Sequence, residues 1–193
     1  SMIQKHIFAV KMIMFSFLLT CITAGCSSTD LKRFVPSVAN LEKEGYNLQV
    51  VIRGEQQQEH LPFLFMRNVE KGPYVMYLSL TTKNSRAERV EIKDATISIE
   101  DAVYSLEPEE SIFELDPKTY TSSGNGGLQT NQLNEGKNSF RFSHNMPYQI
   151  DSDYYVSLTL MIHPSSRQLV FKQKFSFKRI EENKSITETY KDI

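Results

Sequence analysis

The segment Val156-Ser157-Leu158-Thr159-Leu160-Met161-Ile162-His163 decides the fold class of this chain. Valine, leucine and isoleucine occupy every second position. Successive side chains of a β-strand point to opposite faces, so this period of two predicts a strand with one buried face. After Pro164-Ser165-Ser166-Arg167, the same alternation returns from Leu169 to Phe177. The two runs predict a β-hairpin with a loop of about five residues.

Gln173 is the one polar residue on the inward parity of the second run. It predicts either an end of the core or a bulge. Outward from this hairpin, shorter apolar runs predict further strands at 46–52, 61–66, 74–81, 90–99, 102–106 and 111–115, with order resuming near Phe140. Gly54 is expected to end the first of these strands, and Pro62 makes the second an edge strand or a strand entry.

The apolar positions of the 90–99 run change from even to odd residue numbers part-way along the run. Val90 and Ile92 occupy even positions, whereas Ile97 and Ile99 occupy odd ones. A regular strand cannot change faces, so a bulge or a turn is expected within 93–95. Further on, Pro117 is expected to end the 111–115 strand. The Ser- and Gly-rich stretch 121–127 is the strongest loop signal of the chain.

About eight short strands, separated by turn signals, predict an all-β fold. We expect an antiparallel β-sandwich, with a small β-barrel as the alternative. Tyr154, at the start of the penultimate strand, resembles the tyrosine-corner position of immunoglobulin and fibronectin type III domains. The resemblance covers this residue and its strand, without the cysteine pair or core tryptophan of true immunoglobulin domains. It implies an immunoglobulin-like sandwich.

The first 25 residues are typical of an export signal. Lys5 and Lys11 form a basic region before an apolar run at 12–24, which is short for a membrane-spanning helix. Ser1 precedes the methionine and is interpreted as a tag remnant. Residues 1–25 are therefore expected to be a signal peptide.

Ile22-Thr23-Ala24-Gly25-Cys26 resembles the lipobox of bacterial lipoproteins, although Thr23 stands where leucine is most common. The resemblance implies that Cys26 receives a diacylglycerol, that cleavage occurs before it, and that palmitate or a similar acyl chain is added. Two or three chains hold a protein firmly at a membrane. Ser27 follows the cysteine, and by the sorting rule of enteric bacteria this implies the outer membrane, with the domain facing the periplasm.

The remaining chain is expected to be a tether (26–45), a β-sandwich domain (46–182) and a polar tail (183–193). We expect little fixed structure before Tyr46, apart from a short helical piece at 38–43. Past residue 25 the chain has 20 basic and 23 acidic residues, a net charge of −3, since Lys5 and Lys11 lie before it. This balance does not fit a nucleic-acid-binding surface.

The residues that could carry chemistry are widely spaced. Cys21 and Cys26 are the two cysteines, so no disulfide is expected in the domain. The histidines lack metal-ligand spacing, and no metal or cofactor is expected. Asp151-Ser152-Asp153 is interpreted as a turn, and the carboxylates in and beside the 111–115 strand as a solvated strand edge. The histidines are His60, His144 and His163, and the carboxylates are Glu107, Glu109, Glu110 and Glu114.

Three tyrosines remain as candidates for binding. Tyr77, Tyr148 and Tyr155 fall on or near the outward parity, where tyrosine can stack on sugars or anchor a protein. Cross-strand packing is the alternative explanation. The sequence therefore predicts a non-enzymatic, membrane-anchored lipoprotein of the cell envelope that acts through protein–protein contacts. The alternatives are a glycan- or peptidoglycan-binding module and an envelope hydrolase.

Overall fold

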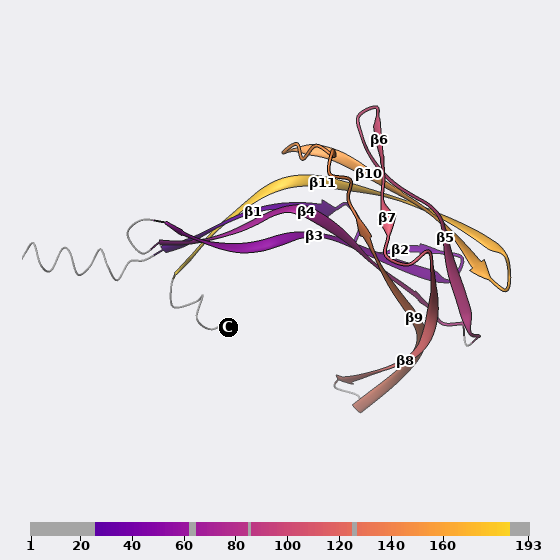
Figure 1. The fold of residues 1–193 in the computed structure, drawn as a ribbon. Helices are drawn as coiled ribbons and strands as arrows, with labels where there is room; N and C mark the ends of the chain where they lie inside the picture. The colour runs from indigo at the N-terminus through magenta and orange to yellow at the C-terminus, as the bar shows by residue number, and fades with distance from the viewer. Residues whose placement is uncertain (1–25, 62–64, 85, 125–126, 186–193) are drawn as a thin grey trace, which may run out of the picture. The chain divides into compact units, whose positions relative to one another are not determined.

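The computed structural model describes residues 26–61, 65–84, 86–124 and 127–185. All regular elements of this part of the chain are strands (Figure 1), and the prediction of an all-β fold is confirmed. The strands are β1 (Cys26–Pro36), β2 (Leu41–Lys43), β3 (Tyr46–Leu61), β4 (Phe65–Thr82), β5 (Glu88–Ile99), β6 (Ala102–Ser105), β7 (Glu107–Pro108), β8 (Ile112–Gly124), β9 (Gly127–Arg141), β10 (Ser152–His163) and β11 (Arg167–Ser185).

The strands belong to a single large mixed sheet. Their order is β2-β3-β4-β1-β11-β10-β5-β8-β9-β7, with β6 paired to β5 and β4 paired additionally to β9. β10 lies between β11 and β5 and is antiparallel to both. β9 has three partners: residues 127–135 pair with β8, residues 134–141 pair with β4, and residues 140–141 pair with β7.

The chain divides into two compact units. Among the described residues, the smaller unit contains 26–31, 56–61, 65–69 and 180–185. In it, Leu31 and Val69 are buried and Arg67 forms an ion pair with Asp30. The larger unit contains Lys32–Glu55 and Glu70–Arg179, and the hydrophobic core lies within it.

The alternation that predicted the β10–β11 hairpin is confirmed by burial. Leu160 and Ile162 in β10, and Leu169, Phe175 and Phe177 in β11, are all fully buried. They share one core with the inward residues of β3, β4 and β5, so separate stretches of the sheet turn their apolar faces to each other, as a sandwich requires. The hairpin loop is shorter than expected, since three residues separate the two strands.

The predicted change of parity in β5 is a β-bulge. The register between β10 and β5 shifts so that Thr159 pairs with Asp94 and Leu160 with Ile92, leaving Lys93 without an opposite residue. The extra residue turns Val90 and Ile97 towards the same core, although their positions differ in parity.

Gln173 marks neither an end of the core nor a bulge. It pairs with Val156 in an unbroken register, and its side chain is 4 % exposed. Its Nε2 donates to the carbonyl of Val38. The inward glutamine therefore attaches the segment between β1 and β2 to β11.

The expectation of a loose tether before Tyr46 is wrong. Residues 26–36 form β1, residues 41–43 form β2, and the predicted helical piece at 38–43 is absent from this segment. Phe34 is buried, with its ring centroid 4.6 Å from that of Phe177. Glu44 and Gly45 both adopt positive φ, as a two-residue hairpin turn into β3 demands.

Three other expected boundaries are wrong. β3 continues past Gly54 to Leu61, and β8 continues past Pro117 to Gly124. The stretch 121–127 contains paired strand residues, with Gly124 opposite Gly127, while residues 125–126 lie outside the described part. A strand that contributes to no core needs no apolar residues, so its polar and glycine-rich sequence resembles that of a loop. Residues 62–64 of the expected 61–66 strand, and the tail after Ser185, also lie outside it.

The tyrosine-corner position carries the hydrogen bonds of that motif. The Tyr154 hydroxyl donates to the carbonyl of Pro147 at 2.8 Å and accepts from the N–H of Gln149 at 2.9 Å. Its ring is fully buried in the core, and burial raises the pKa of the phenol. Tyr154 thus holds the 142–151 connection against the start of β10.

Candidate functional site

Cys26, the predicted lipidation site, is the first residue of β1. The predicted signal peptide at 1–25 lies outside the described residues. Within the described ranges, no helix has the length and apolar character needed to cross a membrane.

The three tyrosines singled out in the sequence do not form one patch. Tyr77 on β4 and Tyr155 on β10 are each 51 % exposed, but β1 and β11 lie between these strands in the sheet. Tyr148 is half-buried, with its ring 4.7 Å from Tyr74 and 5.8 Å from Phe177. Tyr148 therefore contributes to the aromatic side of the core.

Of the three candidate histidines, His163 has a local partner. His163 Nε2 lies 3.0 Å from Glu91, which also accepts a hydrogen bond from Lys93, and these contacts lower the pKa of Glu91, the lysine bond first. His60 and His144 are exposed. Among the described residues, no group of three or more His, Cys, Asp or Glu side chains could hold a metal ion.

Asp153 belongs to a turn and a cross-strand pair. Its carboxylate lies 2.7 Å from Lys174 Nζ and accepts a hydrogen bond from Ser176. The lysine and the serine lower the pKa of Asp153. Asp151 has φ 59°, which a tight turn before β10 requires. The geometry agrees with the turn interpretation of 151–153.

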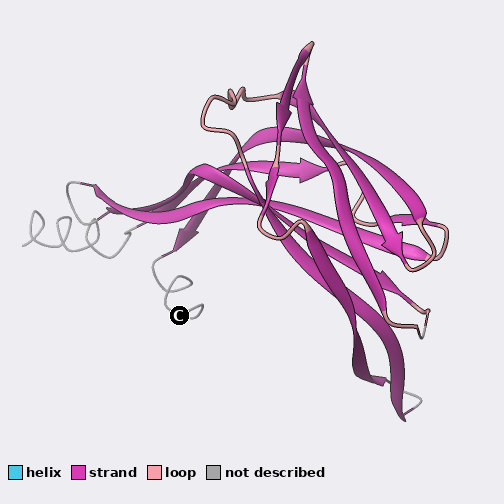
Figure 2. Ribbon diagram, turned by 45° about the vertical axis from the view of Figure 1, so that its right-hand side comes forward, coloured by secondary structure: helices cyan, strands magenta, loops and turns pink. Residues whose placement is uncertain are grey.

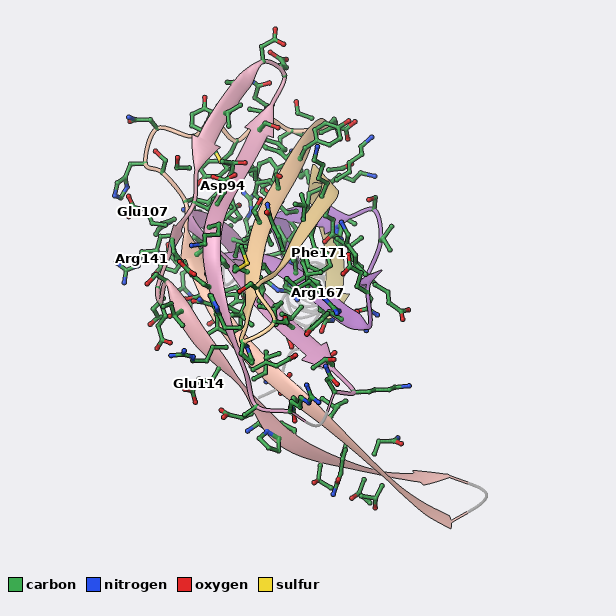
Figure 3. All side chains as sticks on the ribbon, turned by 90° about the vertical axis from the view of Figure 1, so that its right-hand side faces the viewer. Asp94, Glu107, Glu114, Arg141, Arg167 and Phe171 are labelled. Atoms are coloured by element: carbon green, nitrogen blue, oxygen red, sulfur yellow. The ribbon has the colours of Figure 1, made fainter. Side chains whose placement is uncertain are left out.

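Sequence reasoning missed a shallow groove at the root of the β8–β9 hairpin. It has a volume of about 310 Å³, and Glu114, on its border, is labelled in Figure 3. The lining residues carry four carboxylates and two lysines: Glu110, Phe113, Glu114, Asp116, Lys118, Glu135, Gly136 and Lys137. Most of these residues lie on two different strands, so their proximity depends on the pairing of β8 with β9.

Glu135 is the centre of a hydrogen-bond network beside this groove. It accepts bonds from Tyr120 and Ser79, both at 2.9 Å, and Lys137 Nζ lies 3.4 Å away. Burial opposes ionisation of Glu135, but the hydrogen bonds and Lys137 outweigh it and hold its pKa below the usual value. A general acid needs a raised pKa, so Glu135 is suited to organising the surface rather than to donating protons.

Beyond this groove the hairpin becomes a two-stranded ribbon. The side chains of residues 116–121 of β8 and 130–132 of β9 are exposed, whichever face they occupy. Figures 2 and 3 show the hairpin extending away from the rest of the larger unit. A ribbon of two strands without a covered face is marginally stable by itself. We call residues 116–124 of β8 and 127–133 of β9 the hairpin arm.

No protein-family model, curated protein or solved structure matches this chain. The hairpin arm is therefore interpreted from its own geometry. Gly136 lies where β8 leaves β9, and a Cβ there would be 2.7 Å from the carbonyl oxygen of Glu114. Glycine allows β8 and β9 to approach closely at this point. Beyond it the strands separate, and β8 pairs with β5 while β9 pairs with β4.

Proposed function

We propose that this protein is a lipid-anchored lipoprotein of the cell envelope that acts by binding another protein and catalyses no reaction. The lipid on Cys26 would confine the domain to a membrane surface, and the sorting residue Ser27 favours the outer membrane with the domain in the periplasm. Confinement raises the effective concentration of any partner in the same membrane, so even a small contact surface can suffice.

The hairpin arm is the observation that carries this proposal. Its exposed side chains add nothing to the core, and a bare two-stranded ribbon gains little stability from its own contacts. An arm of this kind is stabilised when a partner covers it. Tyr120, which is 46 % exposed, supplies an aromatic contact near its middle.

The experiment is a crosslinked pull-down of the full-length lipoprotein from its native envelope, with co-purifying proteins identified by mass spectrometry. The matched variant replaces residues 119–132 with Asn-Gly, which joins the directly opposed Lys118 and Leu133 by a two-residue turn. This variant keeps the core and removes the exposed arm. A Cys26→Ala variant reports whether membrane attachment is also needed.

We expect a protein that co-purifies with the wild type and is lost with the shortened arm, at unchanged melting temperature. A pull-down that recovers no specific protein from the wild type would contradict the proposed function. A sugar array would then be the next measurement, because glycan binding is the leading alternative.

A further inference from the structure

The backbone of β9 directs alternate residues to opposite edges. The N–H of Phe142, the residue directly after β9, donates to Tyr74 O of β4, whereas Ser139 O within β9 accepts from Glu109 N on the other edge. Backbone groups of successive residues in an antiparallel strand point to opposite sides. Even-numbered residues of β9 therefore turn their N–H and C=O groups towards the β4 side. Pro117, opposite Asn134, fits this parity, since it has no N–H and its backbone faces away from β9.

β4 ends before β9 does. Its last residue, Thr82, pairs with Asn134, and the register of β9 continues without a shift to Gly127. Leu128, Thr130 and Gln132 consequently present three N–H and three C=O groups in line with β4. In the part of the chain that the structure describes, no strand pairs with this edge.

The two edges of the hairpin arm differ at its base. Proteins block free strand edges with charges, prolines or bulges. The β8 edge has Asp116, Pro117 and Lys118 at its base. The β9 edge from Gly127 to Leu133 contains no charge and no proline. From Thr119 to Gly124 the β8 edge is equally free of charge and proline. The β9 edge is distinguished by its uncharged run up to Leu133, which continues the line of β4 from the end of that strand.

We propose that the β9 edge at 128–132 binds an extended segment of a partner protein, which adds antiparallel to β9 end to end with β4. This inference rests on the proposed function and names its binding mode, β-strand addition. Affinity comes from backbone hydrogen bonds to Leu128, Thr130 and Gln132. Because residues 119–133 are uncharged, the segment is uncharged where it pairs.

A second copy of this chain is a poorer occupant. Two arms paired through this edge would overlap over the short run from Gly127 to Leu133, and would bury far less than the roughly 1,000 Å² of a stable interface. A partner segment is free of that limit, because the rest of the partner can contact other surfaces.

The test uses the full-length protein in detergent micelles and a displayed library of random short peptides. Thr130→Pro removes an outward N–H of the β9 edge and obstructs the incoming strand, while the bonds of β9 to β8 remain. Thr119→Pro is the matched control, because Thr119 has the equivalent outward position on the β8 edge. Both side chains are exposed.

We expect selected peptides to bind the wild type and Thr119→Pro equally, and Thr130→Pro about tenfold more weakly. The peptide should slow amide exchange at residues 128, 130 and 132, measured by NMR. Should Thr130→Pro melt below Thr119→Pro, Gln132→Pro replaces it. Equal binding to all variants, protection on the β8 edge instead, or protection of the same amides by self-association would each overturn the inference.

Failure of this inference is distinguishable from failure of the proposed function. A partner that co-purifies equally with wild type and Thr130→Pro would support the proposed function but contradict binding at the β9 edge. A pull-down that recovers no specific protein with the wild type would instead contradict the proposed function itself.

Discussion

Tyr46 and Glu88 form a buried hydrogen bond between a phenol and a carboxylate. Their side chains are 2 % and 7 % exposed, and the Tyr46 hydroxyl donates to Glu88 at 2.8 Å. Asn84 donates to the other carboxylate oxygen at 3.3 Å. Burial, followed by the bond to Glu88, raises the pKa of Tyr46 to about 12. The pair satisfies a carboxylate that would otherwise be costly to bury.

Tyr46→Phe should destabilise the protein by about 1–3 kcal/mol at neutral pH, because Glu88 loses a donor while it stays buried. The unfolded phenol ionises near its ordinary pKa of about 10, but the folded one stays protonated to about 12. The contribution of Tyr46 is therefore present below pH 10 and is lost as pH rises from about 10 to about 12. Urea unfolding across this range should show the wild type converging on the variant. A constant difference would contradict the assignment.

At the scale of single elements, β1 and β9 each connect parts of the sheet. β1 lies between β4 and β11. In the larger unit its Phe34 contacts Tyr74, Tyr154 and Phe177, with ring centroids 4.6–5.4 Å apart. β9 pairs with β8 along one half and with β4 along the other. In each strand the packing can be tested at one residue, which is Phe34 in β1 and Gly136 in β9.

Phe34→Ala should lower the free energy of unfolding by about 3–5 kcal/mol, since it opens a cavity among aromatic rings. Val35→Ala, at the neighbouring exposed position, is the control and should change stability by less than about 0.5 kcal/mol. Chemical denaturation followed by circular dichroism measures both. Equal stability of the two variants would show that β1 is not part of the folded core.

Gly136→Ala should destabilise the protein by about 1–3 kcal/mol, because the added Cβ meets the Glu114 carbonyl and the Phe113 ring. Lys137→Ala, with an exposed side chain beside it, is the comparison and should be nearly neutral. Thermal unfolding distinguishes them. A Gly136→Ala protein as stable as the wild type would mean that β8 and β9 can separate without a glycine.

At the scale of the whole molecule, attachment and recognition are expected to reside in different parts of the chain. In the proposed function, attachment would depend on Cys26 at the start of β1, and recognition on the hairpin arm. The two are therefore separable by substitution. Loss of the lipid should leave the fold of the larger unit intact, since its core contains no cysteine.

Cys26→Ala should abolish labelling by radioactive palmitate and leave an unprocessed precursor in cells. Cys21→Ala is the matched control and should be labelled and processed normally, because it changes a cysteine of the apolar run and keeps the predicted acceptor. Normal labelling of Cys26→Ala would remove the lipobox assignment.

The sequence by itself determined the all-β class, the inward faces of β10 and β11, a bulge or turn within 93–95 and the position of Tyr154. These features share a cause. Each strand packs one face on the core, so apolar residues recur at every second position of its sequence. A residue inserted into such a strand appears as a change of parity, which is why the bulge was visible.

The tertiary structure alone decided the hairpin arm, the groove at its root and the place of β1. The described side chains of the arm at 116–121 and 130–132 are exposed and add nothing to a core, so nothing selects apolar residues at alternate positions, and their polar composition is that of a loop. β1 is a strand because Phe34 fills a space among aromatic rings from β4, β10 and β11. Contacts between residues far apart in the chain leave no local pattern, and only packing reveals them.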